Sequence, residues 1–248
     1  MNHKIRVTIW NEFRHEKHMP EVTALYPEGM HATIGAHLAN DPEIEVTLAA
    51  LDDPEQGLPD EVLNNTDVLL WWGHCAHHEV RDDIVAKIQN RVYQGKMGLV
   101  VLHSGHHSKV FRSVVGTTGN LTWGREQKEI DWCVNPAHPI AAGIPDHFCL
   151  ESEELYAEPF AVQPDELIFT AWFEDGYIMR NGMVFNRGFG KVFYFQPGHE
   201  SCPSYHNEYV ERIIRNGVHY VKPNDFGFEI PEGAPCVHPH KVTDEFKA

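Results

Sequence analysis

The chain has 248 residues, 42% of them hydrophobic and 11% aromatic, which is enough to bury the core of one large domain. Its formal net charge of −16 argues against binding to nucleic acid or to an anionic membrane, because both need clustered positive charge. A small neutral or cationic ligand is compatible with this charge, and the 18 histidines make the acidity partly pH-dependent.

The first half of the chain alternates strand-like and helical segments. A helix is predicted over 29–41, and a second over 78–95, where apolar residues repeat every four positions before Gly95 at a capping position. Strands are predicted at 5–13, 44–51, 67–73 and 98–105. Such alternation is typical of a parallel sheet covered by helices.

The second half changes character. Between about residues 117 and 200, short aromatic and β-branched runs with Asn-Gly and Phe-Gly turns predict mixed or antiparallel strands that extend the sheet. A last helix is predicted over 206–221, and the Pro- and Gly-rich segment 223–248 is predicted to be an extended arm. We therefore expect one three-layer α/β domain over 1–222, with helices on both faces of a mostly parallel central sheet, in a homo-oligomer.

The expected location is the cytoplasm. The first ten residues lead directly into a strand without a basic and apolar leader, and no apolar segment approaches the roughly 20 residues that span a bilayer. The cysteines form no C-x-x-C pair, which favours a reducing compartment; they are Cys75, Cys133, Cys149, Cys202 and Cys236.

Histidines and carboxylates follow four of the predicted strands. Two of these strands are each followed by a His-x-x-His-His group. Ligands of open α/β sheets bind beyond the carboxyl ends of the strands, so we expect these side chains to face one cleft. They are Glu12, Arg14 and His15 after the first strand, His74, His77 and His78 after the third, His103, His106 and His107 after the fourth, and His199 and Glu200 after the last.

The segments that carry these residues resemble the trehalose-utilisation, or ThuA-like, proteins of the class I glutamine-amidotransferase-like superfamily. The resemblance rests on IRVTIWNEFRHE, YPEGMHATIGAHL, DVLLWWGHCAHHEV, VVLHSGHHSKVFR and GKVFYFQPGHE, and it extends to about residue 220. It implies a flavodoxin-like sheet and a role in the metabolism of trehalose or a related disaccharide.

The same comparison argues against a glutaminase. True amidotransferases carry a nucleophilic cysteine in a G-x-C-x-G elbow and a later H-x-E pair. Here the elbow reads VLHSG, with His103 in place of the cysteine, and only the adjacent His199 and Glu200 remain of the pair. Cys75 follows a different strand, and we interpret it as a packed side chain, not a nucleophile.

Other residues allow two interpretations. His31 is equally compatible with the site and with the surface. Glu153 and Glu154 are candidates for a sugar-contacting rim, although an exposed pair is the simpler interpretation. His138 lies in a Pro-containing loop and is expected to be solvated. Trp123 is a candidate for stacking on a sugar ring.

The histidines predict a divalent transition metal, with zinc first, because imidazole is a favoured zinc ligand and catalytic zinc keeps three protein ligands. The predicted ligands are His103 and His107, completed by His74, His15 or His199. Glu12 or Glu200 is the expected outer-sphere partner or general base. The alternative is that the histidines bind a neutral polyol through hydrogen bonds.

Two function classes remain open at this point. The first is a metal-assisted enzyme that acts on a small-molecule carbohydrate, a disaccharide or a keto-sugar. The second is a non-catalytic sugar- or metal-binding module of the same fold. The expected catalytic residues are His103, His199, Glu200 and Glu12, and the expected substrate-binding residues are Arg14, His31, His77 and Trp123.

Overall fold

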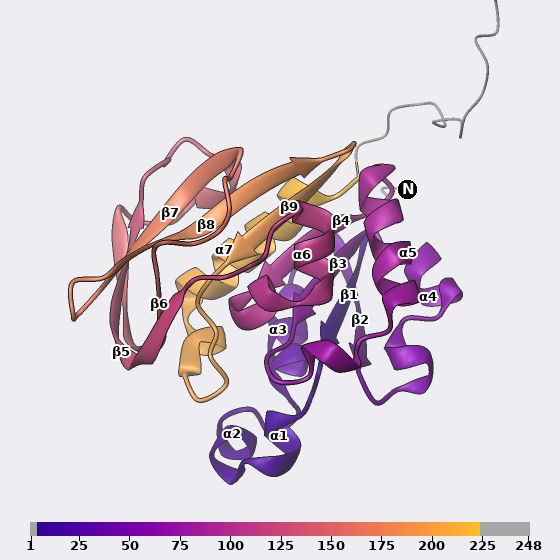
Figure 1. The fold of residues 1–248 in the computed structure, drawn as a ribbon, viewed down its shortest axis with the longest axis horizontal. Coiled ribbons are helices and arrows are strands. Elements are labelled where there is room, and N and C mark those ends of the chain that lie inside the picture. The colour runs from indigo at the N-terminus through magenta and orange to yellow at the C-terminus, as the bar shows by residue number, and fades with distance from the viewer. Residues whose placement is uncertain (1–3, 224–248) are drawn as a thin grey trace, which may run out of the picture.

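A computed structural model describes residues 4–223, in which nine strands form one sheet in the order β2-β1-β3-β4-β9-β8-β7-β5-β6 (Figure 1). Five neighbouring strands are parallel: β2 (Ile44–Ala50), β1 (Ile5–Asn11), β3 (Val68–Trp72), β4 (Gly98–Leu102) and β9 (Gly190–Phe195). The other four continue the sheet in antiparallel fashion: β8 (Ile178–Arg187), β7 (Glu166–Phe173), β5 (Thr122–Cys133) and β6 (His147–Ala157). Both predictions, a mostly parallel sheet and an antiparallel extension, are confirmed.

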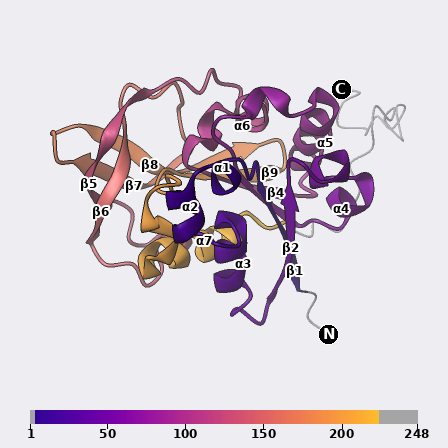
Figure 2. The same cartoon turned by 90° about the horizontal axis from the view of Figure 1, so that it is seen from below.

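Helices cover both faces of the parallel half (Figure 2). On one face lie α3 (Met30–Leu38) and α7 (Glu208–Val221), and on the other lie α4 (Asp60–Asn64), α5 (Asp82–Tyr93) and α6 (Lys109–Val115). The short helices α1 (His15–His18) and α2 (Pro20–Leu25) lie beyond the carboxyl end of β1. The predicted arm, 223–248, lies outside the described residues except for Pro223.

The core consists of two apolar layers, one on each face of the sheet. Successive strand residues point to opposite faces, so the consecutive Trp71 and Trp72 enter different layers. Trp71 lies in the layer covered by α5, where its ring stacks on that of Trp10 with the ring centroids 3.8 Å apart. Trp72 lies in the layer covered by α3 and α7. Because β3 and β4 are buried along their whole length, they fix the position of the loops that follow their carboxyl ends.

The helix predictions are confirmed by burial of the predicted stripes. Ile84, Ile88 and Val92 of α5 are buried, and Gly95 has the left-handed φ of 70° expected after the helix. Helix α5 begins at Asp82, later than predicted, because the residues His77–Glu79 form a separate 3-10 turn. None of the helices in residues 4–223 is both long enough and apolar enough to cross a bilayer.

Candidate functional site

A cavity of about 330 Å³ opens beyond the carboxyl ends of β3 and β4. Its walls come from the β3–α5 connection, the 3-10 turn His103–His107, the start of β5, and β6. The predicted residues His77 and Trp123 lie in these walls, and the Trp123 side chain is 72% exposed. The lining residues are His74, His77, Ser104, His106, His107, Asn120, Leu121, Trp123, Glu154 and Tyr156.

His103 occupies a strained backbone position at the end of β4. Its φ is 47°, in the left-handed region that few side chains adopt, and the residue is fully buried. Nδ1 donates to the carbonyl oxygen of Gln196 at 2.9 Å, which leaves Nε2 facing Glu154 at 3.1 Å and the Tyr156 hydroxyl at 3.3 Å. Burial alone would lower the pKa of His103, but the bond to Glu154 and the nearby carboxylate charges raise it.

Glu200 is a buried carboxylate surrounded by imidazoles. His74 Nδ1 lies 3.0 Å from one oxygen, and His15 Nε2 and His199 Nε2 lie 3.3 and 3.5 Å from the other. Burial opposes ionisation, yet the hydrogen bond from His74 and the charges of the three imidazoles lower the pKa of Glu200 to about 2. The carboxyl ends of β1, β3 and β9 meet at this cluster, and β4 places His103 next to it, with ring centroids 6.0 Å from His74 and 5.3 Å from His199.

Glu12, in contrast, anchors the backbone of the β3–α5 connection. Its carboxylate accepts the backbone N–H groups of His74, Cys75 and Ala76 at 2.6–3.0 Å. Although burial opposes ionisation, these three donors lower the pKa of Glu12. Its oxygens are therefore occupied in holding the loop that presents His74, so the geometry fits an anchoring role better than that of a general base.

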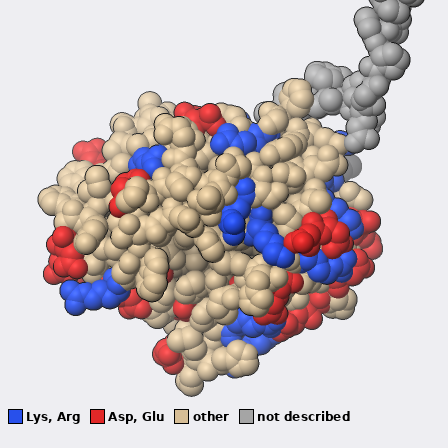
Figure 3. All heavy atoms as spheres, in the orientation of Figure 1, with Lys and Arg blue, Asp and Glu red and all other residues tan. Residues whose placement is uncertain are grey.

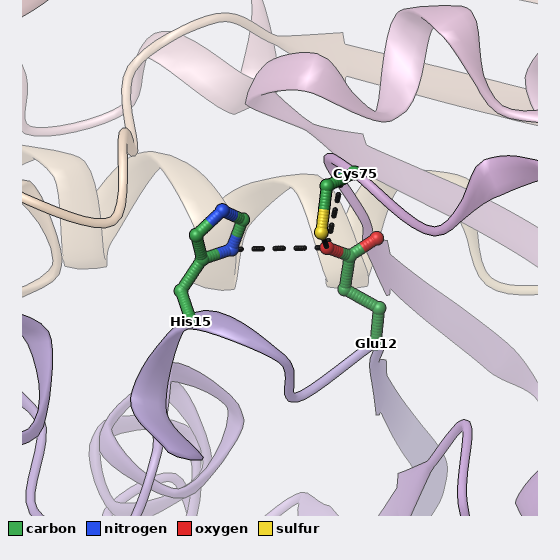
Figure 4. Close-up of side chains that lie close together, drawn as sticks. All are labelled: Glu12, His15 and Cys75. Atoms are coloured by element: carbon green, nitrogen blue, oxygen red, sulfur yellow. Dashed lines mark hydrogen bonds and ion pairs between the residues drawn. The ribbon is translucent and has the colours of Figure 1, made fainter. Parts of the chain in front are cut away.

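Cys75 is not arranged as a nucleophile. Figure 4 shows the His15 ring and the Cys75 thiol approaching the same Glu12 oxygen, at 3.7 and 3.1 Å. Burial, followed by the hydrogen bond to Glu12, raises the pKa of the thiol to about 12. A thiolate is thus disfavoured here, which agrees with the interpretation that Cys75 is not a nucleophile. The expectation of a packed side chain is wrong, because Cys75 is exposed in the loop after β3.

Two predicted substrate-binding residues do not line the cavity. Arg14 pairs with Asp52 and Glu79, and so ties the β1–α1 connection to two neighbouring loops. His31 is buried on α3 next to Asn11, with a burial-lowered pKa. Their contacts support the walls of the site from outside the cavity.

The acidic pair of β6 is not exposed as predicted. Glu153 is fully buried, and it accepts the backbone N–H groups of Gly198 and His199 at 2.8 and 3.0 Å. Glu154 lines the cavity beside His103. The expectation of an exposed pair is wrong because pairing of β6 with β5 turns Glu153 inward. His138, expected to be solvated, is likewise buried and lies 3.0 Å from Glu166.

The predicted metal-ligand set changes in the structure. Within residues 4–223, potential ligand atoms approach to within 4.8 Å of one another in the trios His15–His74–Glu200 and His74–Glu154–His199, among others. Neither trio contains His103 or His107. The 3-10 turn points His107 outward to the cavity rim beside His77, whereas His103 is held between Gln196 and Glu154.

Comparison with known proteins explains this architecture. The profile of a family designated ThuA and described as trehalose utilisation matches residues 6–221. The chain belongs to the ThuA family. No curated protein matches the sequence.

Solved structures show the same fold at low sequence identity. A protein described as ThuA-like from Parabacteroides merdae is 14% identical with a TM-score of 0.65, and the match covers 94% of this chain and 95% of that one. A second ThuA-like protein, from Bacteroides uniformis, is 14% identical with a TM-score of 0.61 over 88% and 91% of the two chains. A glutamine amidotransferase from Thermotoga maritima is 14% identical with a TM-score of 0.50 over 80% and 77%. The ThuA family thus shares the amidotransferase-like α/β fold.

Proposed function

We propose that this ThuA-family protein is a metal-assisted enzyme that acts on a neutral carbohydrate, either a disaccharide such as trehalose or a keto-sugar. The observation that carries the proposal is the buried Glu200 carboxylate with three imidazoles around it. Within residues 4–223, neither Glu200 nor Glu154 forms an ion pair with Lys or Arg. A buried carboxylate that lacks such a partner is a good position for a cation.

We assign His15, His74 and Glu200 as the metal ligands. In a tetrahedral zinc site with bonds of about 2.0–2.1 Å, neighbouring ligand atoms lie about 3.3 Å apart. His74 Nδ1 lies 3.0 Å from one Glu200 oxygen and His15 Nε2 lies 3.3 Å from the other, and one ligand atom from each of the three residues lies within 4.8 Å of the others, so the side chains are close enough to converge on one ion. Two histidines with one glutamate is also a ligand set of catalytic zinc, and zinc is therefore our first choice.

The outer contacts of these ligands support the assignment. His15 would bind through Nε2, because its buried Nδ1 makes no hydrogen bond and lies 3.7 Å from a Glu12 oxygen. A carboxylate behind a metal-binding imidazole orients the ring and raises its basicity. Glu12 therefore acts on two ligands, since it also holds the backbone of His74.

The side of the cluster that faces the cavity carries the groups for proton transfer. A bound divalent metal would polarise a carbonyl or hydroxyl oxygen of the substrate. Glu154 and Tyr156 line the cavity, and His103 Nε2 contacts both. His103 is fully buried and lies behind the cavity wall, so a proton would pass between it and the substrate through Glu154 or the Tyr156 hydroxyl.

The remaining walls suit a neutral sugar. The cavity lining includes no Lys or Arg, and burial lowers the pKa of His77 to about 4 and of His106 to about 3. Both imidazoles are therefore uncharged at neutral pH and can bond to hydroxyl groups. On the face shown in Figure 3, Lys and Arg are interspersed with Asp and Glu. The exposed Trp123 ring offers a surface for a sugar ring.

The test begins with metal content. Protein purified without a histidine tag is supplied with zinc, freed of excess metal and analysed for elements. We expect close to one metal per chain, and less than about 0.2 would contradict the proposal. His74→Ala and Glu200→Gln should lose the metal. His107→Ala, at the cavity rim, is the matched control and should retain it, which also separates this ligand set from the one predicted from sequence.

The second step measures chemistry. The zinc-loaded protein is incubated with trehalose, related disaccharides and their keto derivatives, with and without a chelator. Product formation that stops on chelation supports the enzyme. Sugar-dependent thermal stabilisation without any product would instead support the non-catalytic binding module.

A further inference from the structure

His199 is held by a pair of residues that no part of the proposed function uses. Its Nδ1 lies 2.6 Å from the hydroxyl oxygen of Ser201, and that hydroxyl donates its proton to Glu126 Oε1. Glu126 belongs to β5, whereas His199 and Ser201 lie in the loop that follows β9. The same carboxylate oxygen also lies 3.3 Å from His199 Nδ1.

These contacts determine which ring nitrogen carries the proton. Because the Ser201 hydroxyl proton goes to Glu126, its oxygen faces Nδ1 with a lone pair, and Nδ1 must supply the hydrogen. The Ser201 backbone N–H also points to Nδ1, but at 3.4 Å it is beyond the usual range for an N–H donor. His199 is therefore held as the Nδ1–H tautomer, with a lone pair on Nε2.

The other surroundings of His199 favour the opposite tautomer. Its Nε2 lies 3.5 Å from a Glu200 oxygen and 3.8 Å from a Glu154 oxygen. Carboxylates accept hydrogen bonds, so without Ser201 and Glu126 the proton would be drawn to Nε2. That would leave Nε2 without a lone pair for the group of potential ligand atoms that His199 forms with His74 and Glu154.

We propose that Ser201 and Glu126 are positioning residues that keep His199 in the Nδ1–H tautomer, so that Nε2 offers a lone pair to the cluster formed with His74 and Glu154. A carboxylate behind an imidazole is the usual device for fixing a ligating histidine, and here a serine hydroxyl extends its reach. The importance of Nε2 rests on the proposed function, whereas the tautomer itself does not.

The experiment reads the tautomer directly. The full-length, metal-free protein is labelled with ¹⁵N, and long-range ¹H–¹⁵N correlation spectra distinguish the protonated from the unprotonated ring nitrogen of His199. We expect Nδ1–H in the wild type. Ser201→Ala and Glu126→Ala should move the proton wholly or partly to Nε2. Ser201→Thr keeps the hydroxyl and should restore Nδ1–H.

Ser152→Ala is the matched control. Ser152 also donates to Glu126, at 3.4 Å, but none of its hydrogen bonds involves an imidazole, so its removal should leave the tautomer unchanged.

Each outcome is decisive. An Nε2–H tautomer in the wild type, or an unchanged tautomer in both Ser201→Ala and Glu126→Ala, would overturn the inference. If the wild type binds no metal but shows the expected tautomer changes, the metal assignment fails and the positioning role stands. Thermal unfolding of each variant confirms that the spectra come from folded protein.

Discussion

The two halves of the sheet reach burial in different ways. In the parallel half, β3 and β4 are apolar along their whole length and lie between helices. The antiparallel half buries polar side chains, among them Glu129, Asp131 and Asn181, while Trp132 and Trp172 are exposed. The parallel half supplies most of the imidazoles of the site, and the antiparallel half supplies Glu154 and Tyr156. The site therefore lies between two regions. We call the buried strands β3 and β4 the apolar scaffold, and we call the polar side chains of the antiparallel half the polar wall.

The largest expected effect tests the polar wall. Glu153→Ala removes the acceptor for the backbone N–H groups of Gly198 and His199 and for the Ser204 hydroxyl. Leaving these donors unpaired should lower the free energy of unfolding by about 2–4 kcal/mol, measured by urea denaturation. Glu151→Ala, an exposed glutamate on the same strand, should change it by less than about 0.5 kcal/mol. Equal losses would show that the wall is not held by Glu153.

The second prediction concerns pH. Burial raises the pKa of Asp131 to about 7 and holds that of Glu129 well above its usual value, next to Asn181 and Glu153. The folded protein therefore keeps protons that the unfolded chain releases near pH 4. This contribution to stability is complete below about pH 4 and is lost as the pH rises to about 7.

Asp131→Asn should remove that loss. Between pH 5 and pH 8 the urea midpoint of the variant should fall less than that of the wild type. At pH 8 its free energy of unfolding should be about 1–3 kcal/mol higher relative to the wild type than at pH 5. Asp175→Asn, in the exposed turn between β7 and β8, is the control and should follow the wild type. Parallel pH curves for Asp131→Asn and the wild type would contradict the prediction.

A smaller effect is expected at the outer edge of the polar wall. Trp123→Ala should weaken sugar binding about five- to tenfold, measured by calorimetry, because the exposed ring offers a stacking surface. Stability should hardly change. Trp172→Ala removes a similarly exposed indole that does not line the cavity, and it should leave sugar binding intact. If only the Trp172 variant lost sugar binding, the sugar site would lie at the surface around Trp172 and not in the cavity.

The smallest effect is expected at Cys75, an exposed residue in the loop after β3. Cys75→Ser replaces a thiol of raised pKa by a hydroxyl that can still donate to Glu12. Catalytic turnover should remain within about twofold of the wild type. A loss of more than about a hundredfold, the size of a nucleophile or general-base contribution, would make Cys75 a participant in the chemistry.

The same contrast explains what the sequence could predict. The apolar periodicity of α5 and the unbroken runs of β3 and β4 are local signals, and they correctly located the edge at which His74 and His103 gather. The burial of Glu153 depends on pairing between β5 and β6, which no local pattern of ESEELY records. His107 was grouped with His103 because they are close in sequence. A 3-10 turn repeats every three residues, so it brings His106, not His107, to the face of His103.

The left-handed backbone at His103 implies that this fold sets the position of the residue independently of the chemistry of its side chain. A non-glycine residue in that conformation costs about 1–2 kcal/mol, a cost that the surrounding layers must offset whatever side chain is present. The strands β4 and β9 fix the position of the residue at this turn, and the identity of its side chain decides which chemistry it can support. In this protein the turn holds the His103 imidazole directly behind Glu154 and Tyr156, two residues of the cavity wall.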